Sequence, residues 1–225
     1  MLGNFKKGKI MNRLLLLFFL SLSVSCYAQI DSTTITIGKI DDNILSTITN
    51  LENIQLITLS NKDTTLYGNR FFLFIQEYKD GILKKEDSLD LTCIEKKVPF
   101  VIGKDTSYYS INTCDRITFK KPSKIFKIII AGKIKEDTMH LLIKYPSIIF
   151  KRKLKADNTY LFREFKLNGQ ARIPLNKKSP ILLYTPPYKI SKGINYYCIL
   201  DNKPIKTIYD KYKIQHFYVF LLAIK

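Results

Sequence analysis

The chain has 225 residues, of which 46% are hydrophobic and 25% charged, and its formal net charge is +18. This composition is typical of a globular protein, and a mean hydropathy of -0.06 excludes a protein with many membrane spans. With two histidines and nine glycines, the chain has neither a histidine-rich metal motif nor a glycine-rich phosphate loop. The sequence therefore indicates where the protein is located and how it folds more directly than which reaction or ligand it has.

The N-terminus has the three-part pattern of a secretory signal peptide. Four basic residues precede an apolar run at residues 14–24, and small residues follow it. A membrane-spanning helix needs roughly 20 apolar residues, so a run of about eleven is too short to span. The pattern predicts a signal peptide over residues 1–28, with Met11 as an alternative start.

Two kinds of cleavage fit this segment. Ala28 and Cys26 are small residues one and three places before Gln29, as signal peptidase requires. The segment end, Cys-Tyr-Ala-Gln, resembles signal-peptide ends common in AT-rich Gram-negative bacteria. The alternative is a lipobox in which Cys26 is acylated, although Ser23 departs from the lipoprotein pattern. Both predict export, to the periplasm, the outer membrane or the medium.

Removal of residues 1–28 leaves three cysteines. Cys93 and Cys114 lie in neighbouring strand-like segments, and in an oxidising compartment they are the expected disulfide pair, with Cys198 reduced. The alternative is that all three are buried, reduced thiols. Their spacing matches no metal motif, so no metal site is expected.

Charge is unevenly distributed along the exported chain. Residues 29–95 carry a net charge of -5 and residues 96–225 one of +19. Such a field attracts anionic surfaces. Only six of the 37 basic residues are arginine, which makes most base-specific contacts, so nucleic acid is a poor match. Anionic lipid headgroups or acidic polysaccharide are the expected partners, and the alternative is that the lysines only solvate the surface.

Apolar residues recur mainly with period two, and the chain has 14 tyrosines and 14 phenylalanines. The pattern predicts an all-β fold: an antiparallel β-sandwich-like domain, or two, built from hairpins within residues 29–225. A charged run at residues 151–158 marks a seam if there are two domains. The segment 43–54 fits a helix by its apolar spacing and a strand by its composition. Residues 214–224 are apolar on both faces, which predicts a strand inside a sheet.

Turn signals predict four hairpins. Apolar and polar residues alternate in segments 126–135 and 138–145, which predicts an antiparallel pair with one face exposed to solvent and a turn at Glu136 and Asp137. The other three turns are expected at Asp80–Gly81, at Asn168–Gly169, and at residues 201–202 between a strand at 194–200 and one returning through Ile205.

Residues two apart on a strand share a face, so lysines of the 126–145 pair should gather on its wet side. A following extended segment would enlarge this face. The candidate anionic-surface residues are Lys127, Lys133, Lys135, Lys144, Lys151, Lys153 and Lys155.

These observations predict a non-catalytic binding or scaffolding protein of the bacterial envelope, with no cofactor. One alternative is a carbohydrate hydrolase, which needs two carboxylates beside a sugar bond; the candidates are Glu77, Asp87, Asp90 and Glu95. Another is a subunit of an export or adhesion assembly, docking other envelope proteins through an apolar edge strand. Cys198 with His140 or His216 is a weaker catalytic hypothesis because no motif surrounds them.

Overall fold

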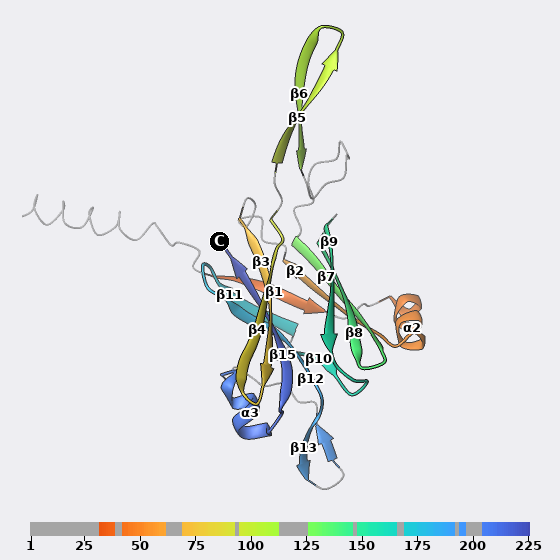
Figure 1. Cartoon of the computed structure of the whole chain (residues 1–225), viewed down its shortest axis with the longest axis vertical. Coiled ribbons are helices and arrows are strands. Elements are labelled where there is room, and N and C mark those ends of the chain that lie inside the picture. Colours follow the sequence, from red (N-terminus) through yellow and green to blue (C-terminus); the bar gives the residue numbers. More distant parts are fainter. Residues whose placement is uncertain are drawn as a thin grey trace, which may run out of the picture. The chain divides into compact units, whose positions relative to one another are not determined.

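Two antiparallel sheets contain most of the strands in this computed structural model (Figure 1). The structure describes residues 32–38, 42–61, 69–92, 95–112, 126–145, 148–165, 169–191, 194–196 and 204–225. The six-stranded sheet has the order β11 (Gln170–Pro174), β1 (Ser32–Gly38), β2 (Ile54–Asn61), β7 (Phe126–Lys135), β8 (Thr138–Tyr145), β9 (Ile148–Lys155). The five-stranded sheet has the order β10 (Leu161–Glu164), β12 (Ser179–Thr185), β15 (His216–Ile224), β3 (Phe71–Lys79), β4 (Ile82–Asp90).

Two further hairpins form two-stranded sheets of their own. One consists of β5 (Glu95–Ile102) and β6 (Asp105–Asn112), and the other of β13 (Tyr188–Ser191) and β14 (Ile194–Tyr196). The two helices in the described part of the chain are α2 (Asn43–Leu51) and α3 (Lys206–Tyr212).

The main core lies between the two large sheets. Leu59, Ile130 and Met139 of the six-stranded sheet pack in one cluster with Leu73 and Phe220 of the five-stranded sheet. All five of these side chains are fully buried. This face-to-face burial is the arrangement of a β-sandwich and confirms the predicted all-β fold.

A second core covers the other face of the five-stranded sheet. Leu183 of β12 and Val219 of β15 pack there with Ile208 of α3. β15 is therefore buried on both faces and lies between β12 and β3, as its two-sided apolar sequence predicts.

Two of the predicted hairpins are present. β3 and β4 pair around Asp80 and Gly81, whose φ values of 52° and 75° are those of the turns that match strand twist. β7 and β8 pair from Ile129 to Lys144, with Glu136 at a positive φ in the connecting turn.

The hairpin predicted at Asn168–Gly169 is wrong. β10 pairs with β12 and β11 pairs with β1, so the chain passes from one large sheet to the other at this point. Gly169 has φ +65°, and a Cβ there would lie 2.7 Å from the carbonyl oxygen of Ile37. Glycine is therefore required here because the backbone of β1 passes too close for a side chain. A hairpin turn requires glycine as well, so the local sequence could not distinguish the two cases.

The strand predicted to return through Ile205 is also wrong, because Ile205 caps α3. Residues 197–203, including the expected turn, lie outside the described residues. The 43–54 segment, for which the sequence allowed a helix or a strand, forms the helix α2 over Asn43–Leu51. The Asp42 carboxylate accepts hydrogen bonds from the backbone N–H groups of Ile44 and Leu45. This contact satisfies two donors that a helix N-terminus leaves unpaired.

Candidate anionic-surface binding site

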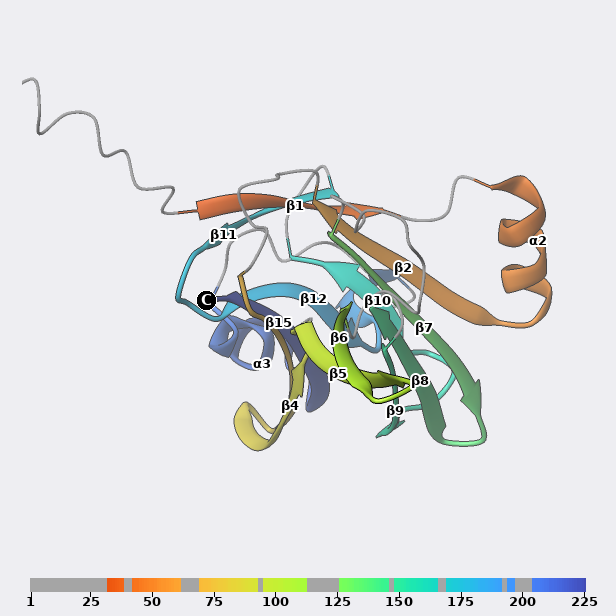
Figure 2. The ribbon, with the colours of Figure 1, turned by 90° about the horizontal axis from the view of Figure 1, so that it is seen from above.

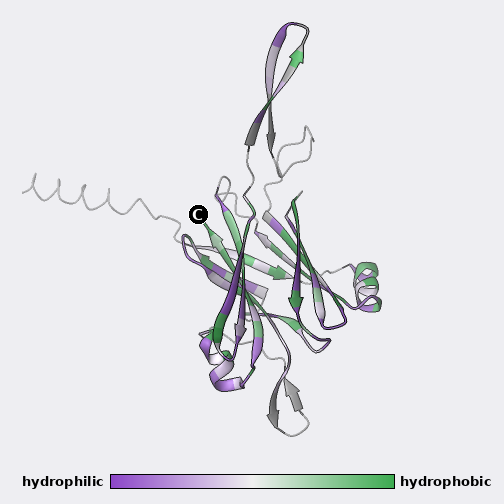
Figure 3. Cartoon of the chain, in the orientation of Figure 1, coloured by the Kyte–Doolittle hydropathy of each residue, from purple (hydrophilic) through white to green (hydrophobic). Residues whose placement is uncertain are grey.

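All seven candidate lysines lie on one face of β7, β8 and β9, and all seven are exposed. The alternate positions, such as Ile128, Ile130, Leu141 and Ile143, are buried in the core. Figure 3 shows this alternation of hydrophilic and hydrophobic residues along the strands. The lysines therefore project from the outer side of the six-stranded sheet; the seven are called the lysine face below.

Cross-strand pairing arranges these lysines in rows. Lys133, His140 and Lys153 are directly opposite one another on the three strands, and so are Lys135, Thr138 and Lys155. Neighbouring strands are about 4.8 Å apart, so two lysines at the ends of a row have backbones about 10 Å apart. That separation is close to the Debye length at physiological salt, which is about 8 Å, so their fields overlap.

Apolar side chains lie between the ammonium groups. Lys144 is opposite Ile129 and Ile149, and Lys151 is opposite Leu142. Ile149 is half exposed, and the other two are partly buried. The lysine stems can cover these apolar side chains while the charged ends remain in water.

The outward positions of β7, β8 and β9 carry no acidic residue in the described part of these strands. Carboxylates adjoin these strands in the turn at Glu136 and Asp137, at Asp157 two residues after β9, and at Glu52, which follows α2. Lys133 Nζ lies 2.6 Å from Glu52 Oε2, and this hydrogen bond lowers the pKa of Glu52. The Glu52 carboxylate offsets the positive charge of Lys133, while no ion pair to the other six lysines occurs among the described residues.

The lysine face presents several separate, hydrated ammonium groups on the outer side of a β-sheet. Lysine ammonium groups lack the planar fork with which arginine recognises one carboxylate or phosphate in two contacts. The only arginine of β9, Arg152, points to the other side and pairs with Asp87 of β4, at the facing edge of the five-stranded sheet. The face therefore suits a repeating anionic surface better than a single small anion.

The carboxylates of the hydrolase hypothesis have separate partners. Asp87 pairs with Arg152, and Asp90 pairs with Arg70, with 3.1 Å between Asp90 Oδ2 and Arg70 Nη2. Glu77 contacts His216 and Tyr218. Glu95 is the first residue of β5, and its side chain lies outside the described part of the structure.

Glu77, His216 and Tyr160 form a hydrogen-bonded chain that the sequence does not signal. His216 Nε2 is 3.0 Å from Glu77 Oε1, and the Tyr160 hydroxyl is 2.9 Å from His216 Nδ1. Burial raises the pKa of Tyr160 to about 12. Contacts across 139 and 56 residues leave no local pattern in the sequence; the only local feature is that His216 and Tyr218 are two residues apart at the start of an otherwise apolar strand.

The neighbouring Tyr218 links this chain of polar groups to the other sheet. Its hydroxyl donates to the carbonyl of Lys155, 3.2 Å away, and accepts from the Lys155 N–H at 3.0 Å. Lys155 ends β9, so the contact joins the edge of the six-stranded sheet to the middle of the five-stranded sheet. These contacts support a structural role for the cluster at the end of the sandwich.

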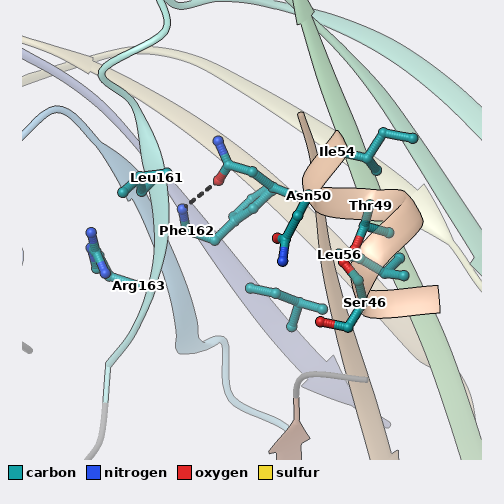
Figure 4. A pocket seen from close by; sticks show the side chains of 10 residues that line it. Ser46, Thr49, Asn50, Ile54, Leu56, Leu161, Phe162 and Arg163 are labelled. Carbon is teal, nitrogen blue, oxygen red and sulfur yellow. Dashed lines mark hydrogen bonds between the residues drawn. The ribbon is translucent and has the colours of Figure 1, made fainter. Parts of the chain in front are cut away.

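A cavity of about 290 Å³ lies between α2, β2 and β10. Figure 4 shows Ser46, Thr49 and Asn50 of α2 on one side of it and Phe162 and Arg163 of β10 on the other. None of the four hydrolase candidates lines it.

Gln55 fixes one wall of this cavity. Its amide nitrogen donates to the Tyr160 carbonyl at 2.7 Å, and its oxygen accepts from the Phe162 N–H at 3.0 Å. One side chain of β2 thus pairs with two backbone groups at the start of β10 and connects the two sheets.

Several sequence predictions fall outside the described residues. These are the signal peptide, the lipidation candidate Cys26, the disulfide candidates Cys93 and Cys114, and Cys198. His140, one of the histidines considered with Cys198, lies exposed on β8 among the lysines. Within the described ranges, no three or more His, Cys, Asp or Glu side chains gather at one place where they could hold a metal ion. In the same ranges, no helix combines the length and the apolar composition of a membrane span.

The fold and this surface define a β-sandwich with a basic sheet face. Comparison with known proteins adds no family to that description, since no protein-family model, curated protein or solved structure matches the chain.

Proposed function

We propose that this protein is a non-catalytic binding module of the bacterial cell envelope that attaches to an anionic surface through its lysine face. The observation that carries the proposal is the placement of seven exposed lysines on one face of three adjacent strands, without an acidic residue among the outward strand positions. Anionic phospholipid headgroups are the proposed ligand, and acidic polysaccharide is the alternative anionic surface.

Export is part of this proposal. The N-terminal pattern predicts cleavage before Gln29, and β1 begins at Ser32, three residues later. Cleavage there would therefore leave every described strand in the exported chain. The proposed location is the periplasm or the periplasmic side of the outer membrane.

The hydrolase alternative has less support. Asp87 and Asp90 are each paired with an arginine, and the Glu77 carboxylate is held by His216 and Tyr218. A glycosidase needs two carboxyl groups facing the same sugar bond, one of them able to give a proton. Each of these three carboxylates is held by different residues, which does not favour two of them acting together as acid and base on one sugar bond.

Vesicle sedimentation tests the proposal. The exported chain, beginning at Gln29, should sediment with vesicles containing phosphatidylglycerol but not with pure phosphatidylcholine vesicles at low salt. Bound protein should decrease as ionic strength rises, because exposed charges are screened. Release by an acidic polysaccharide at constant ionic strength would favour the polysaccharide, and absence of binding to either polyanion would contradict the proposal.

A further inference from the structure

The apolar side of α2 faces solvent instead of the protein core. Ile44, Ile48 and Leu51 are 75%, 48% and 78% exposed, and Leu45 is also exposed. No residue of the helix is buried. A surface helix normally places its apolar stripe against the core and its polar side in water.

The polar side of the same helix faces the protein. Ser46, Thr49 and Asn50 line the cavity between α2, β2 and β10, as Figure 4 shows. At about 100° per residue, these three positions lie on the side of the helix opposite Ile44, Ile48 and Leu51. The orientation of α2 is therefore reversed with respect to an ordinary surface helix, and its apolar side has no described partner in the chain.

The reversed helix adjoins the lysine face. Leu51 is the last residue of α2, and the next residue, Glu52, forms the ion pair with Lys133. After one further residue, β2 begins at Ile54, which is directly opposite Lys133 in the six-stranded sheet. Figures 1 and 2 both show α2 beside the end of β2 at which that strand begins. The exposed apolar side of α2 and the lysine face are thus adjacent, and the ion pair of Glu52 with Lys133 joins them.

Charge complementarity indicates what covers the helix. A basic surface beside exposed isoleucine and leucine side chains matches an anionic bilayer, whose phosphate groups lie directly above its acyl chains. A nine-residue helix is about 13 Å long, so it can lie in the interface but cannot cross the membrane. An acidic polysaccharide would account for the lysines and leave the apolar stripe in water.

We infer that α2 is a membrane-interface helix, which inserts its Ile44–Ile48–Leu51 side into the outer acyl region of an anionic bilayer while the lysine face binds the headgroups. This inference rests on the proposed function and narrows its ligand from an anionic surface to an anionic lipid bilayer.

A single tryptophan can report insertion, because the chain has none of its own. Ile48→Trp places the fluorophore on the exposed side of α2, and Val101→Trp places it on β5 at a position that is 69% exposed. With vesicles containing phosphatidylglycerol, emission of Ile48→Trp should shift to shorter wavelength and be quenched by brominated acyl chains. Emission of Val101→Trp should change in neither way.

A second variant measures the contribution of the apolar stripe. Ile44→Ser/Leu51→Ser should lower vesicle partitioning at least about tenfold, because two apolar side chains no longer leave water on binding. The remaining binding should be lost at a lower salt concentration than in the unmodified chain. Thermal stability without lipid should be unchanged, since both side chains are exposed.

The results that overturn the inference are distinct from those that overturn the proposed function. Sedimentation with anionic vesicles, with no spectral change in Ile48→Trp, would leave the lysine face as the binding site and show that α2 does not insert. A blue-shifted Ile48→Trp in a lipid-free dimer, or a destabilised Ile44→Ser/Leu51→Ser chain, would show that protein covers the helix instead. Absence of sedimentation with anionic vesicles would overturn the proposed function and the inference with it.

Discussion

Lys133 of β7 and Glu52, the residue after α2, form an ion pair with 2.6 Å between Nζ and Oε2. Both side chains are about half exposed, so the pair adds little to stability. The importance of the ion pair is its position, because it connects the lysine face to the end of the exposed apolar helix α2. The proposed binding surface consists of these two parts.

Processing of the N-terminus is the first prediction. Mass spectrometry of the protein recovered from an expressing Gram-negative cell should give a first residue of Gln29, or its cyclised form. A diacylated or triacylated Cys26 would establish the lipoprotein alternative. An uncleaved chain in the cytoplasm would contradict export altogether.

The second prediction is a disulfide between Cys93 and Cys114. It would close a loop of 22 residues and stabilise the fold by about 3 kcal/mol, because cross-linking restricts the unfolded chain. Non-reducing peptide mapping of the exported protein should find this one bridge, with Cys198 reduced. A bridge that includes Cys198 would show that the pairing is wrong, and three free thiols would favour the alternative of reduced cysteines.

Two glycines give a matched test of the contact between the β3–β4 turn and α3. Gly81 and Gly103 both have positive φ, at 75° and 64°. A Cβ at Gly81 would lie 2.8 Å from Cδ1 of Tyr209, whereas at Gly103 nothing is within 4 Å.

Gly103→Ala should therefore cost about 1 kcal/mol, from backbone strain alone. Gly81→Ala should cost about 2 to 3 kcal/mol, because the methyl group also displaces the Tyr209 ring. Urea denaturation of the two variants measures the difference. Equal losses would mean that Tyr209 moves aside freely and that this turn is not held against α3.

Alkaline pH should destabilise the sandwich through its buried tyrosines. Burial raises the pKa of Tyr160 to about 12, against about 10 in an unfolded chain. Because the folded-state pKa is the higher one, the stabilisation is complete below pH 10 and is lost as pH rises from 10 towards 12. Tyr160 alone should account for about 2 kcal/mol of that loss.

Urea denaturation at pH 8, 10 and 11 tests this dependence. In Tyr160→Phe the decrease above pH 10 should be smaller, and the stability at pH 8 should be about 1 kcal/mol lower, because the contacts with His216 are lost. Tyr145, whose pKa burial also raises to about 12, serves as a second site with the same expected behaviour. Ionisation of all tyrosines near pH 10 in the folded protein would contradict this explanation.

Local patterns were sufficient for part of the fold and for the lysine face. The alternation in β7 and β8 and the Asp80–Gly81 turn depend on residues close together in the sequence, so they could be predicted. The same alternation placed Lys127, Lys133, Lys135 and Lys144 on one side. The extended state of β9 added the other three lysines.

Features that depend on distant residues could not be predicted in this way. Gly169 is required by the carbonyl of Ile37 on another strand, and in the sequence it looks the same as a hairpin glycine. The polar side of α2 lies against β2 and β10, which is far away in the sequence, so the helical spacing alone could not show that the apolar side is exposed. The contact of Glu77 with His216 spans 139 residues.

Charge reversal on matched surfaces tests the central claim most directly. Lys135→Glu/Lys153→Glu changes two exposed residues of the lysine face, and Lys84→Glu/Lys206→Glu makes the same charge change on β4 and α3. At about 1 kcal/mol per lysine near an anionic membrane, loss of two lysines in the first variant should weaken binding to phosphatidylglycerol vesicles about 30-fold at low salt, and the repulsion of the two new carboxylates should weaken it further. The second should bind almost as well as the unmodified chain. Equal weakening of both variants would show that net charge alone attracts the protein to the membrane and would contradict a binding site on the lysine face.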